Sequence, residues 1–316
     1  MRRLLDMAAA IAQHPINTLI QGETGTGKEV VARFLHQQSP RRQKPFIAVN
    51  CSAVPETLFE SAMFGIEKGV ATGVSFRKGF LEEASGGTLF LDELAEMSLS
   101  NQAKLLRVLE RGEVTRVGSV NPVPVDIQLV CATHVPLEQA VKEGRFREDL
   151  FYRVDVVELQ VPPLRERGDD ILLLAQMFLE RDCAEMKRER LTLSPVAQSL
   201  LLRYPWPGNV RELGNEMKRA AALTSGSVIE WRDLSPRLLH SGEVEKFLCR
   251  SDGGRTEADG EELPLNLQEA EILLVKRALR QAGGNKARAA SLLGLSREGL
   301  RKKMQRMGGA LEGGNS

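Results

Sequence analysis

The chain has 316 residues, of which 42% are hydrophobic and 27% are charged, the ordinary balance of a globular protein with about two domains. Its four dispersed cysteines form no C-x-x-C pair, which argues against a disulfide framework or a zinc site and favours a cytoplasmic location. No apolar run approaches the roughly 18 residues of a membrane span, so we expect no membrane partner.

The formal net charge of +1 conceals an uneven distribution. Ten Lys or Arg and one acid, Glu298, lie between Val275 and Met307, whereas the rest of the chain has 33 basic and 41 acidic residues. A basic C-terminal end on an acidic body indicates a local module that binds a polyanion.

Short apolar runs alternate with helical patterns in the first half of the chain. This alternation predicts an α/β domain with a parallel sheet over residues 1–165. We expect strands at residues 16–21, 46–50, 88–92 and 127–133, with helices between them, for example at 28–37 and 102–111.

The strands are expected to stop after Pro162-Pro163, where the pattern becomes helical. This change predicts a second, helical domain over residues 166–239. Its helices are expected at residues 169–188, 194–203 and 209–225.

The C-terminal quarter begins with a polar, aperiodic stretch. Residues 240–263 are rich in Gly, Ser and acids, which predicts a flexible linker. Helical periodicity then predicts a small all-α domain over residues 264–308, followed by a disordered tail at 309–316.

Residues 22–28 match the phosphate-binding loop G-x-x-x-x-G-K and stand between a predicted strand and a predicted helix. The glycines let backbone N–H groups surround phosphate oxygens, and the helix N-terminus adds positive potential. We expect Lys28 to reach the β- and γ-phosphates of ATP. The predicted nucleotide-binding residues are Gly22, Glu23, Thr24, Gly25, Thr26, Gly27, Lys28 and Glu29.

Two acids follow the buried strand predicted at residues 88–92. Asp92 is expected to hold Mg²⁺ directly or through water, and Glu93 to polarise the water that attacks the γ-phosphate. The alternative is that the two acids only cap a following helix, but the phosphate loop upstream favours the catalytic interpretation.

Residues 1–239 resemble the AAA+ domain of bacterial enhancer-binding proteins, the ATP-driven activators of sigma-54 RNA polymerase. Glu29 after the phosphate-loop lysine is typical of that family. The resemblance implies a three-layer AAA+ sandwich with a parallel sheet, followed by a helical lid. It rests on the motifs at residues 22–29, 46–51, 86–93, 146–153, 162–167 and 206–213.

The resemblance also implies roles for four further residues. Asn50 matches a switch that holds the catalytic glutamate in an inactive pose, although an asparagine there could simply satisfy backbone groups. Arg147 and Arg153 match fingers that reach a neighbour's γ-phosphate, and Arg211 matches a sensor that couples the lid to the nucleotide. Surface salt bridges are the alternative for these arginines. Fingers acting in trans imply a homo-oligomeric ring, hexameric in the family.

Two features depart from the family. His134 stands where the resemblance leads us to expect an asparagine that senses the γ-phosphate. No sensing domain and no adenine-enclosing segment precede Met1. We therefore expect control by a regulatory protein acting in trans, by expression level, or by a segment that is missing because the chain starts late.

The predicted C-terminal domain resembles a Fis-type helix-turn-helix, which implies DNA as a partner, at upstream enhancer-like sites. Asn285 and Ser296 are placed as N-caps, and Gly294 as the end of the first helix. A solvated basic helix pair is the alternative. The predicted DNA-binding residues are Ser296, Arg297, Arg301, Lys302 and Lys303.

Residues 69–74 occupy the place of the G-A-F-T-G-A loop that contacts sigma-54 in the family. They are Gly69, Val70, Ala71, Thr72, Gly73 and Val74. Because Ala71 replaces the aromatic residue, two hypotheses remain: an activator that remodels the sigma-54 holoenzyme, and a DNA-binding regulator or repressor that no longer engages it. A non-transcriptional AAA+ machine fits neither the motifs nor the terminal module.

Overall fold

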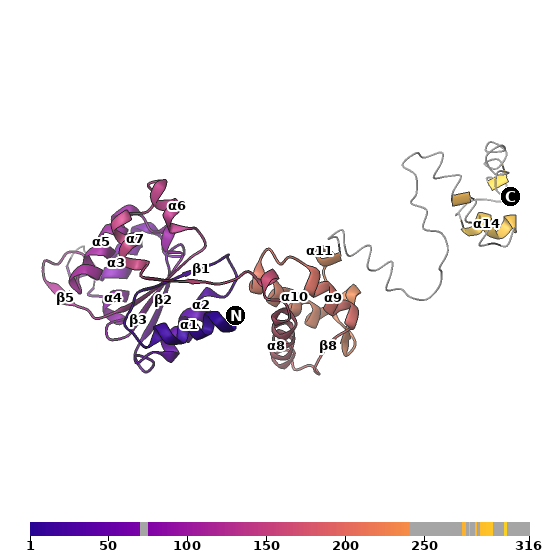
Figure 1. Ribbon diagram of the computed structural model, residues 1–316, viewed down its shortest axis with the longest axis horizontal. Helices are drawn as coiled ribbons and strands as arrows, with labels where there is room; N and C mark the ends of the chain where they lie inside the picture. Colours follow the sequence, from indigo (N-terminus) through magenta and orange to yellow (C-terminus); the bar gives the residue numbers. More distant parts are fainter. Residues whose placement is uncertain are drawn as a thin grey trace. The chain divides into compact units, whose positions relative to one another are not determined.

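The computed structural model describes residues 1–69 and 75–239, together with residues 274–275, 278, 282, 285–292 and 300–301. The chain divides into two compact units, Met1–Asp252 and Gly253–Ser316. Figure 1 shows the ribbon and labels many of the helices and strands of the first unit, and α14 in the second. Among the described residues, no helix is long and apolar enough to cross a bilayer.

A five-stranded sheet forms the centre of the α/β domain, the N-terminal part of the first unit (Figure 1). Its strand order is β2-β3-β6-β1-β7, and all four neighbouring pairs are parallel, which confirms the predicted fold class. The strands are β1 (Thr18–Gln21), β2 (Phe46–Asn50), β3 (Thr88–Asp92), β6 (Gln128–Thr133) and β7 (Val157–Gln160).

The sequence predicted four of these strands and missed β7. This strand has four residues, lies at the edge of the sheet, and buries only Leu159 fully. A short edge strand with one buried position carries little periodicity, so its sequence pattern is weak.

Helices cover both faces of the sheet and complete three layers. One face packs on α1 (Arg2–Ala12) and α2 (Lys28–Gln38), and the other on α3 (Glu56–Phe64), α4 (Phe80–Glu83), α5 (Leu99–Arg111), α6 (Leu137–Lys142) and α7 (Glu148–Val154). Successive strand residues point to opposite faces. Leu89 therefore joins the core beneath α5, whereas Phe90 joins the core beneath α1 and α2.

A hairpin that the sequence did not predict follows α5. It consists of β4 (Glu113–Thr115) and β5 (Pro122–Pro124), paired antiparallel. Residue Ile66 forms bridges to both Arg77 and Val117, so the hairpin's connecting segment joins the stem of the loop that contains Gly69. Of that loop, Gly69 is described, with φ 87°, whereas residues 70–74, Val70 to Val74, lie outside the described residues.

Two glycines touch at the base of this stem. A Cβ atom on Gly79 would lie 2.3 Å from the backbone nitrogen of Gly65, and one on Gly65 would lie 2.8 Å from the nitrogen of Gly79. No side chain fits at either glycine between the two chain segments, because real Cβ atoms do not approach other atoms so closely.

A helical lid with its own core follows the sheet domain. Trp206 is fully buried in this core and donates from Nε1 to the carbonyl of Leu201 at 2.8 Å. A two-residue parallel pair, β8 (Thr192–Leu193) with β9 (Val228–Ile229), corrects the expectation that the strands stop before the lid. The helices are η2 (Leu164–Glu166), α8 (Asp170–Glu185), α9 (Pro195–Arg203), α10 (Asn209–Leu223), η3 (Trp231–Asp233) and α11 (Pro236–Leu239).

The second unit is described only in part. Helix α14 (Lys286–Leu292) begins after Asn285, whose Oδ1 accepts from the Arg288 amide at 3.3 Å, as the predicted N-cap requires. Ala289 and Leu300 are buried, and Arg301 is exposed. Ser296, Arg297, Lys302, Lys303 and the predicted linker lie outside the described residues.

Candidate active site

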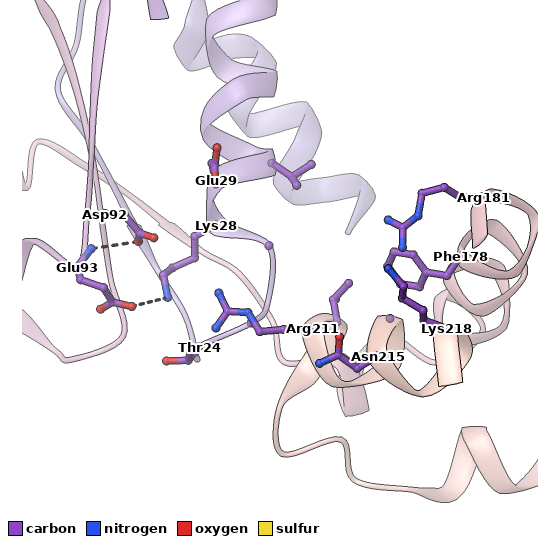
Figure 2. A pocket seen from close by; sticks show the side chains of 15 residues that line it. Thr24, Lys28, Glu29, Asp92, Glu93, Phe178, Arg181, Arg211, Asn215 and Lys218 are labelled. Atoms are coloured by element: carbon purple, nitrogen blue, oxygen red, sulfur yellow. Dashed lines mark hydrogen bonds and ion pairs between the residues drawn. The ribbon is translucent and has the colours of Figure 1, made fainter. Parts of the chain in front are cut away.

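A cleft of about 440 Å³ lies between the phosphate loop, the end of β3 and the lid (Figure 2). The loop and strand contribute Lys28, Asp92 and Glu93, and lid helix α10 contributes Arg211. Figure 2 shows Arg211 between these acids and the lid residues. The structure therefore gathers the predicted phosphate, metal and sensor residues in one place.

Glycine is required at the phosphate loop for two physical reasons. Gly25 and Gly27 adopt left-handed backbone conformations, with φ 80° and 95°. A Cβ on Gly25 would also lie 2.5 Å from the carbonyl oxygen of Gly208 in the lid, so a side chain would push the lid away.

Lys28 is held by its own loop. The side chain is 6% exposed, and Nζ donates to the carbonyl oxygens of Gly22 at 3.0 Å and Glu23 at 3.4 Å. Nζ also lies 3.9 Å from Oε1 of Glu93. The ammonium group thus stands at the mouth of the loop, where a phosphate oxygen would replace the carboxylate as its partner.

Asp92 is suited to a cation. Burial first, and then the charge of Glu93, raise the pKa of the Asp92 carboxyl, and a divalent cation would offset both effects. No cluster of three or more protein ligands occurs among the described residues. Mg²⁺ commonly takes one or two carboxylates plus substrate phosphates, and Asp92 beside the phosphate loop fits that pattern.

Glu29 stands where many phosphate loops have a Ser or Thr that binds Mg²⁺, but its carboxylate is engaged by another residue. Its Oε1 accepts from Nε and Nη2 of Arg33, one turn further along α2, at 3.0 and 2.7 Å. Among the described acids of the cleft, Asp92 is therefore better placed than Glu29 to hold a metal.

Glu93 follows β3 in a left-handed conformation, with φ 53°. Non-glycine residues adopt this conformation rarely and mainly where the surroundings impose it. The Nδ1–H of His134, which follows β6, donates to Oε2 of Glu93 at 2.5 Å. Sequence reasoning noticed His134 as a departure from the family but did not predict this contact.

Asn50 has other partners than Glu93. Its Oδ1 accepts from the backbone amide of Ser52 at 2.9 Å and from the Ser52 hydroxyl at 2.7 Å. No hydrogen bond joins Asn50 to Glu93 among the residues that the structure describes. The role of Asn50 as a switch stays a prediction.

The lid is bonded directly to the phosphate loop. Asn209, fully buried and with φ 52°, donates from Nδ2 to Oε2 of Glu23 at 3.0 Å and to the carbonyl of Thr24 at 3.1 Å. The amides of Val210 and Arg211, at the start of α10, donate to the carbonyl of Gly25 at 2.9 and 3.3 Å. The sequence indicated a lid but not these bonds.

Glu23 joins the same network through the segment after β7. Arg165 donates to both carboxylate oxygens of Glu23, at 3.0 and 2.6 Å. The hydrogen bonds from Arg165 and Asn209 lower the pKa of the Glu23 carboxyl to about 2. Glu23 is therefore a structural anion of the loop, with its carboxylate engaged by Arg165 and Asn209.

The two predicted finger arginines lie elsewhere on the α/β domain. Arg147, at the N-terminus of α7, donates to the Asp149 carboxylate at 3.0 and 2.7 Å and is half exposed. Arg153 donates to the carbonyl of Leu109 at 2.8 Å and lines a separate cleft of about 420 Å³. Neither is among the described residues that line the nucleotide cleft.

Three family models match successive parts of the chain. The sigma-54 interaction domain matches residues 1–160, the AAA+ ATPase lid domain matches 165–247, and the bacterial regulatory protein domain of the Fis family matches 267–307. The chain belongs to the sigma-54 activator family of enhancer-binding proteins.

Curated relatives of this enhancer-binding protein include regulators from several bacteria. It is 44% identical to the regulatory protein AtoC of Escherichia coli over 95% of its own length and 64% of AtoC. It is 43% identical to the hydrogenase transcriptional regulatory protein HoxA of Cupriavidus necator over 96% of its length. The chain spans 63% of HoxA, and thus somewhat less than two thirds of both relatives.

Solved structures of NtrX from Brucella abortus share the fold of this enhancer-binding protein. The complex of NtrX with ADP aligns with a TM-score of 0.71 at 32% identity, covering 97% of this chain and 67% of NtrX. The complex of NtrX with ATP aligns with a TM-score of 0.70 at 31% identity, covering 98% and 67%.

Proposed function

We propose that this enhancer-binding protein hydrolyses ATP in an oligomeric ring, binds DNA through its C-terminal module, and uses the hydrolysis to remodel sigma-54 RNA polymerase. The observation that carries the proposal is the convergence of Lys28, Asp92, Glu93 and Arg211 on one cleft. Lys28 supplies a positive charge for the phosphates and Asp92 a metal ligand. Glu93 supplies a base, and Arg211 a second positive charge from the lid. Phosphoryl transfer to water requires groups of these kinds.

The chemistry follows from the positions of these side chains. Lys28 would bind the β- and γ-phosphates, and Asp92 would hold Mg²⁺, which neutralises the phosphate charge when bound. The Glu93 carboxylate would accept a proton from the attacking water. We further propose that Arg147 and Arg153 act in the site of a neighbouring subunit, and hence that the protein assembles into a ring, a hexamer as the family resemblance implies.

The proposal for DNA rests on the basic C-terminal end and on the match to the Fis-family domain. We propose Arg301 and the neighbouring basic residues as its contacts to phosphates and bases. A regulatory protein acting in trans is a further proposal. A cytoplasmic location is another, and the dispersed cysteines support it.

The sequence of residues 69–74 favours a second candidate function. With Ala71 in place of an aromatic residue, the loop lacks an anchor of the kind that is worth roughly 2 kcal/mol or more at an interface. The second candidate is a DNA-binding AAA+ regulator or repressor that does not engage sigma-54.

One pair of measurements separates the candidates. We would measure the ATPase rate and open-complex formation at a sigma-54 promoter for the natural chain and for Ala71→Phe. Open complexes that depend on ATP support the first candidate, and a gain with Ala71→Phe identifies the weakened anchor. Normal ATPase activity without open complexes in either variant supports the second candidate.

A further inference from the structure

The partner of Glu93 in this chain is a histidine from the neighbouring strand. β3 and β6 are adjacent and parallel, so Glu93 and His134, which follow them, leave the same edge of the sheet. The two side chains meet through Nδ1 of His134 and Oε2 of Glu93. A carboxylate can only accept, so the proton lies on Nδ1.

The backbone on either side holds this pair in place. Thr133 is fully buried, and its hydroxyl bonds to both the amide and the carbonyl of Val135 at 3.1 Å, which fixes the turn that carries His134. Glu93 has a left-handed backbone, and its amide donates to Oδ1 of Asp92 at 3.0 Å. Few rotamers of Glu93 satisfy both this backbone and the imidazole.

The bond from His134 occupies one oxygen of the Glu93 carboxylate and leaves the other available to accept a proton from water. Oε2 of Glu93 accepts from His134, while Oε1 faces Lys28 at 3.9 Å, a distance that is longer than a hydrogen bond. Once phosphates engage Lys28, Oε1 is the free acceptor and points into the cleft. Fixing one oxygen of a general base is how an orienting group improves the geometry of proton transfer.

We propose that His134 is a positioning residue that orients the Glu93 carboxylate for the attack of water on ATP. The inference deepens the proposed function and rests on it. Among the described residues no hydrogen bond joins Asn50 to Glu93, and His134 is the side chain that donates to the Glu93 carboxylate.

The side-chain geometry gives a matched pair of variants. The amide nitrogen of asparagine is attached to Cγ, as Nδ1 of histidine is, so His134→Asn keeps a donor at the same number of bonds from the backbone. His134→Ala removes the donor. His14→Ala is the control, because His14 is an exposed histidine at the end of α1, away from the cleft.

We would measure kcat, KM and the dissociation constant for ADP at a protein concentration that saturates assembly. We expect His134→Ala to lower kcat by roughly tenfold or more with the ADP affinity unchanged within about twofold. We expect His134→Asn to restore most of kcat and His14→Ala to match the natural chain. A kcat of His134→Ala equal to that of the natural chain would overturn the proposal.

A double variant distinguishes positioning from a structural role. Because His134 acts through the carboxylate, His134→Ala should cost nothing further when Glu93 is already Gln. An additive loss, together with a lower unfolding midpoint, would show that His134 only supports the fold and would contradict positioning.

The bond itself can be observed without turnover. In the nucleotide-free protein labelled with ¹⁵N-histidine, we expect a hydrogen-bonded imidazole N–H resonance that disappears in Glu93→Ala and in His134→Asn. If the natural chain shows no ATPase activity that depends on Glu93, the proposed function fails and this resonance still tests the contact. Active enzyme without the resonance refutes the positioning role alone.

Discussion

Asn209, the first residue of lid helix α10, donates a hydrogen bond from Nδ2 to the Glu23 carboxylate of the phosphate loop at 3.0 Å. The Oδ1 of the same side chain accepts from the backbone amide of Leu164 at 2.8 Å. One buried amide group thus joins the loop, the lid helix and the segment that connects the two domains.

Replacing Asn209 should therefore destabilise the protein and loosen the lid. We expect Asn209→Gly, which keeps the left-handed backbone, to cost about 1–3 kcal/mol because the Leu164 amide loses its partner. Asn209→Ala should cost about 1 kcal/mol more because of backbone strain. Urea denaturation measures both costs, and Asn215→Ala, at an exposed site of the same helix, is the control. Equal stability of all variants would contradict the role of this side chain.

Variants of Lys28 and Glu93 should affect ATP binding and ATP hydrolysis differently. Lys28→Ala removes the cation at the loop, so we expect ATP binding to be lost. Glu93→Gln keeps the shape of the side chain but removes the base, so we expect binding to persist while hydrolysis falls by about 100-fold or more. Calorimetric titration with ATP and a phosphate-release assay test the two expectations. Hydrolysis that persists in Glu93→Gln would assign the base elsewhere.

If Arg147 and Arg153 act in a neighbour's site, as we propose, variants of the finger and of the base should complement each other when mixed. Arg153→Ala keeps Glu93 but lacks a finger, and Glu93→Gln keeps the finger but lacks the base. Each variant alone should have little ATPase activity, whereas mixed rings contain some interfaces with both residues and should regain part of it. The dependence on mixing ratio can be followed by phosphate release. Mixtures that stay as inactive as their components would argue against action in trans, for which Arg147→Ala is a parallel test.

The buried histidine of α2 predicts a loss of stability in acid. His36 is 8% exposed and its Nδ1 lies 2.9 Å from the hydroxyl of Thr88. Burial lowers the pKa of His36 below its usual 6.5. The unfolded chain then binds the proton more readily than the folded protein does. The contribution of His36 to the free energy of unfolding is therefore fully present above pH 6.5, and it is lost as the pH falls through the pKa of His36 in the folded state.

His36→Gln tests this dependence, because glutamine can bond to Thr88 but does not titrate. We expect the urea midpoint of the natural chain to fall more between pH 7.5 and about 5.5 than that of the variant. His14→Ala, at an exposed histidine, should behave as the natural chain does. The same dependence in all three proteins would place the titrating group elsewhere.

DNA binding by the C-terminal module should depend on salt. If Arg301 contacts a phosphate, Arg301→Ala should weaken binding to all sequences alike and reduce the slope of log K against log salt by about 1. Fluorescence anisotropy with a labelled duplex at several salt concentrations measures both effects. An unchanged slope would remove Arg301 from the interface.

The sequence predicted the sheet domain well because its signals are local. The phosphate loop, the acids after β3 and the buried strands each occupy a few consecutive residues, and the structure brings Lys28, Asp92 and Glu93 together as expected. The hairpin of β4 and β5 was missed because each strand has three residues and leaves little periodicity.

Contacts between distant parts of the chain could not be predicted in the same way. Asn209 reaches Glu23 across 186 positions of the sequence, and His134 reaches Glu93 across 41. Such pairs depend on how domains and strands pack, which no local pattern encodes. The motif W-P-G-N contained a local signal for the left-handed backbone of Asn209, which asparagine tolerates better than most residues, but no signal for its contact with Glu23.

The contact between Gly65 and Gly79 has a consequence for the loop that runs between these two glycines. Entry and exit of the loop are pinched together by backbone atoms alone, so the distance between its two ends is fixed. The two ends therefore keep the same spacing whichever side chains the loop carries. A substitution at residue 71 changes the chemistry of the loop and leaves that spacing as it is, so this position can be varied without rebuilding the base of the loop.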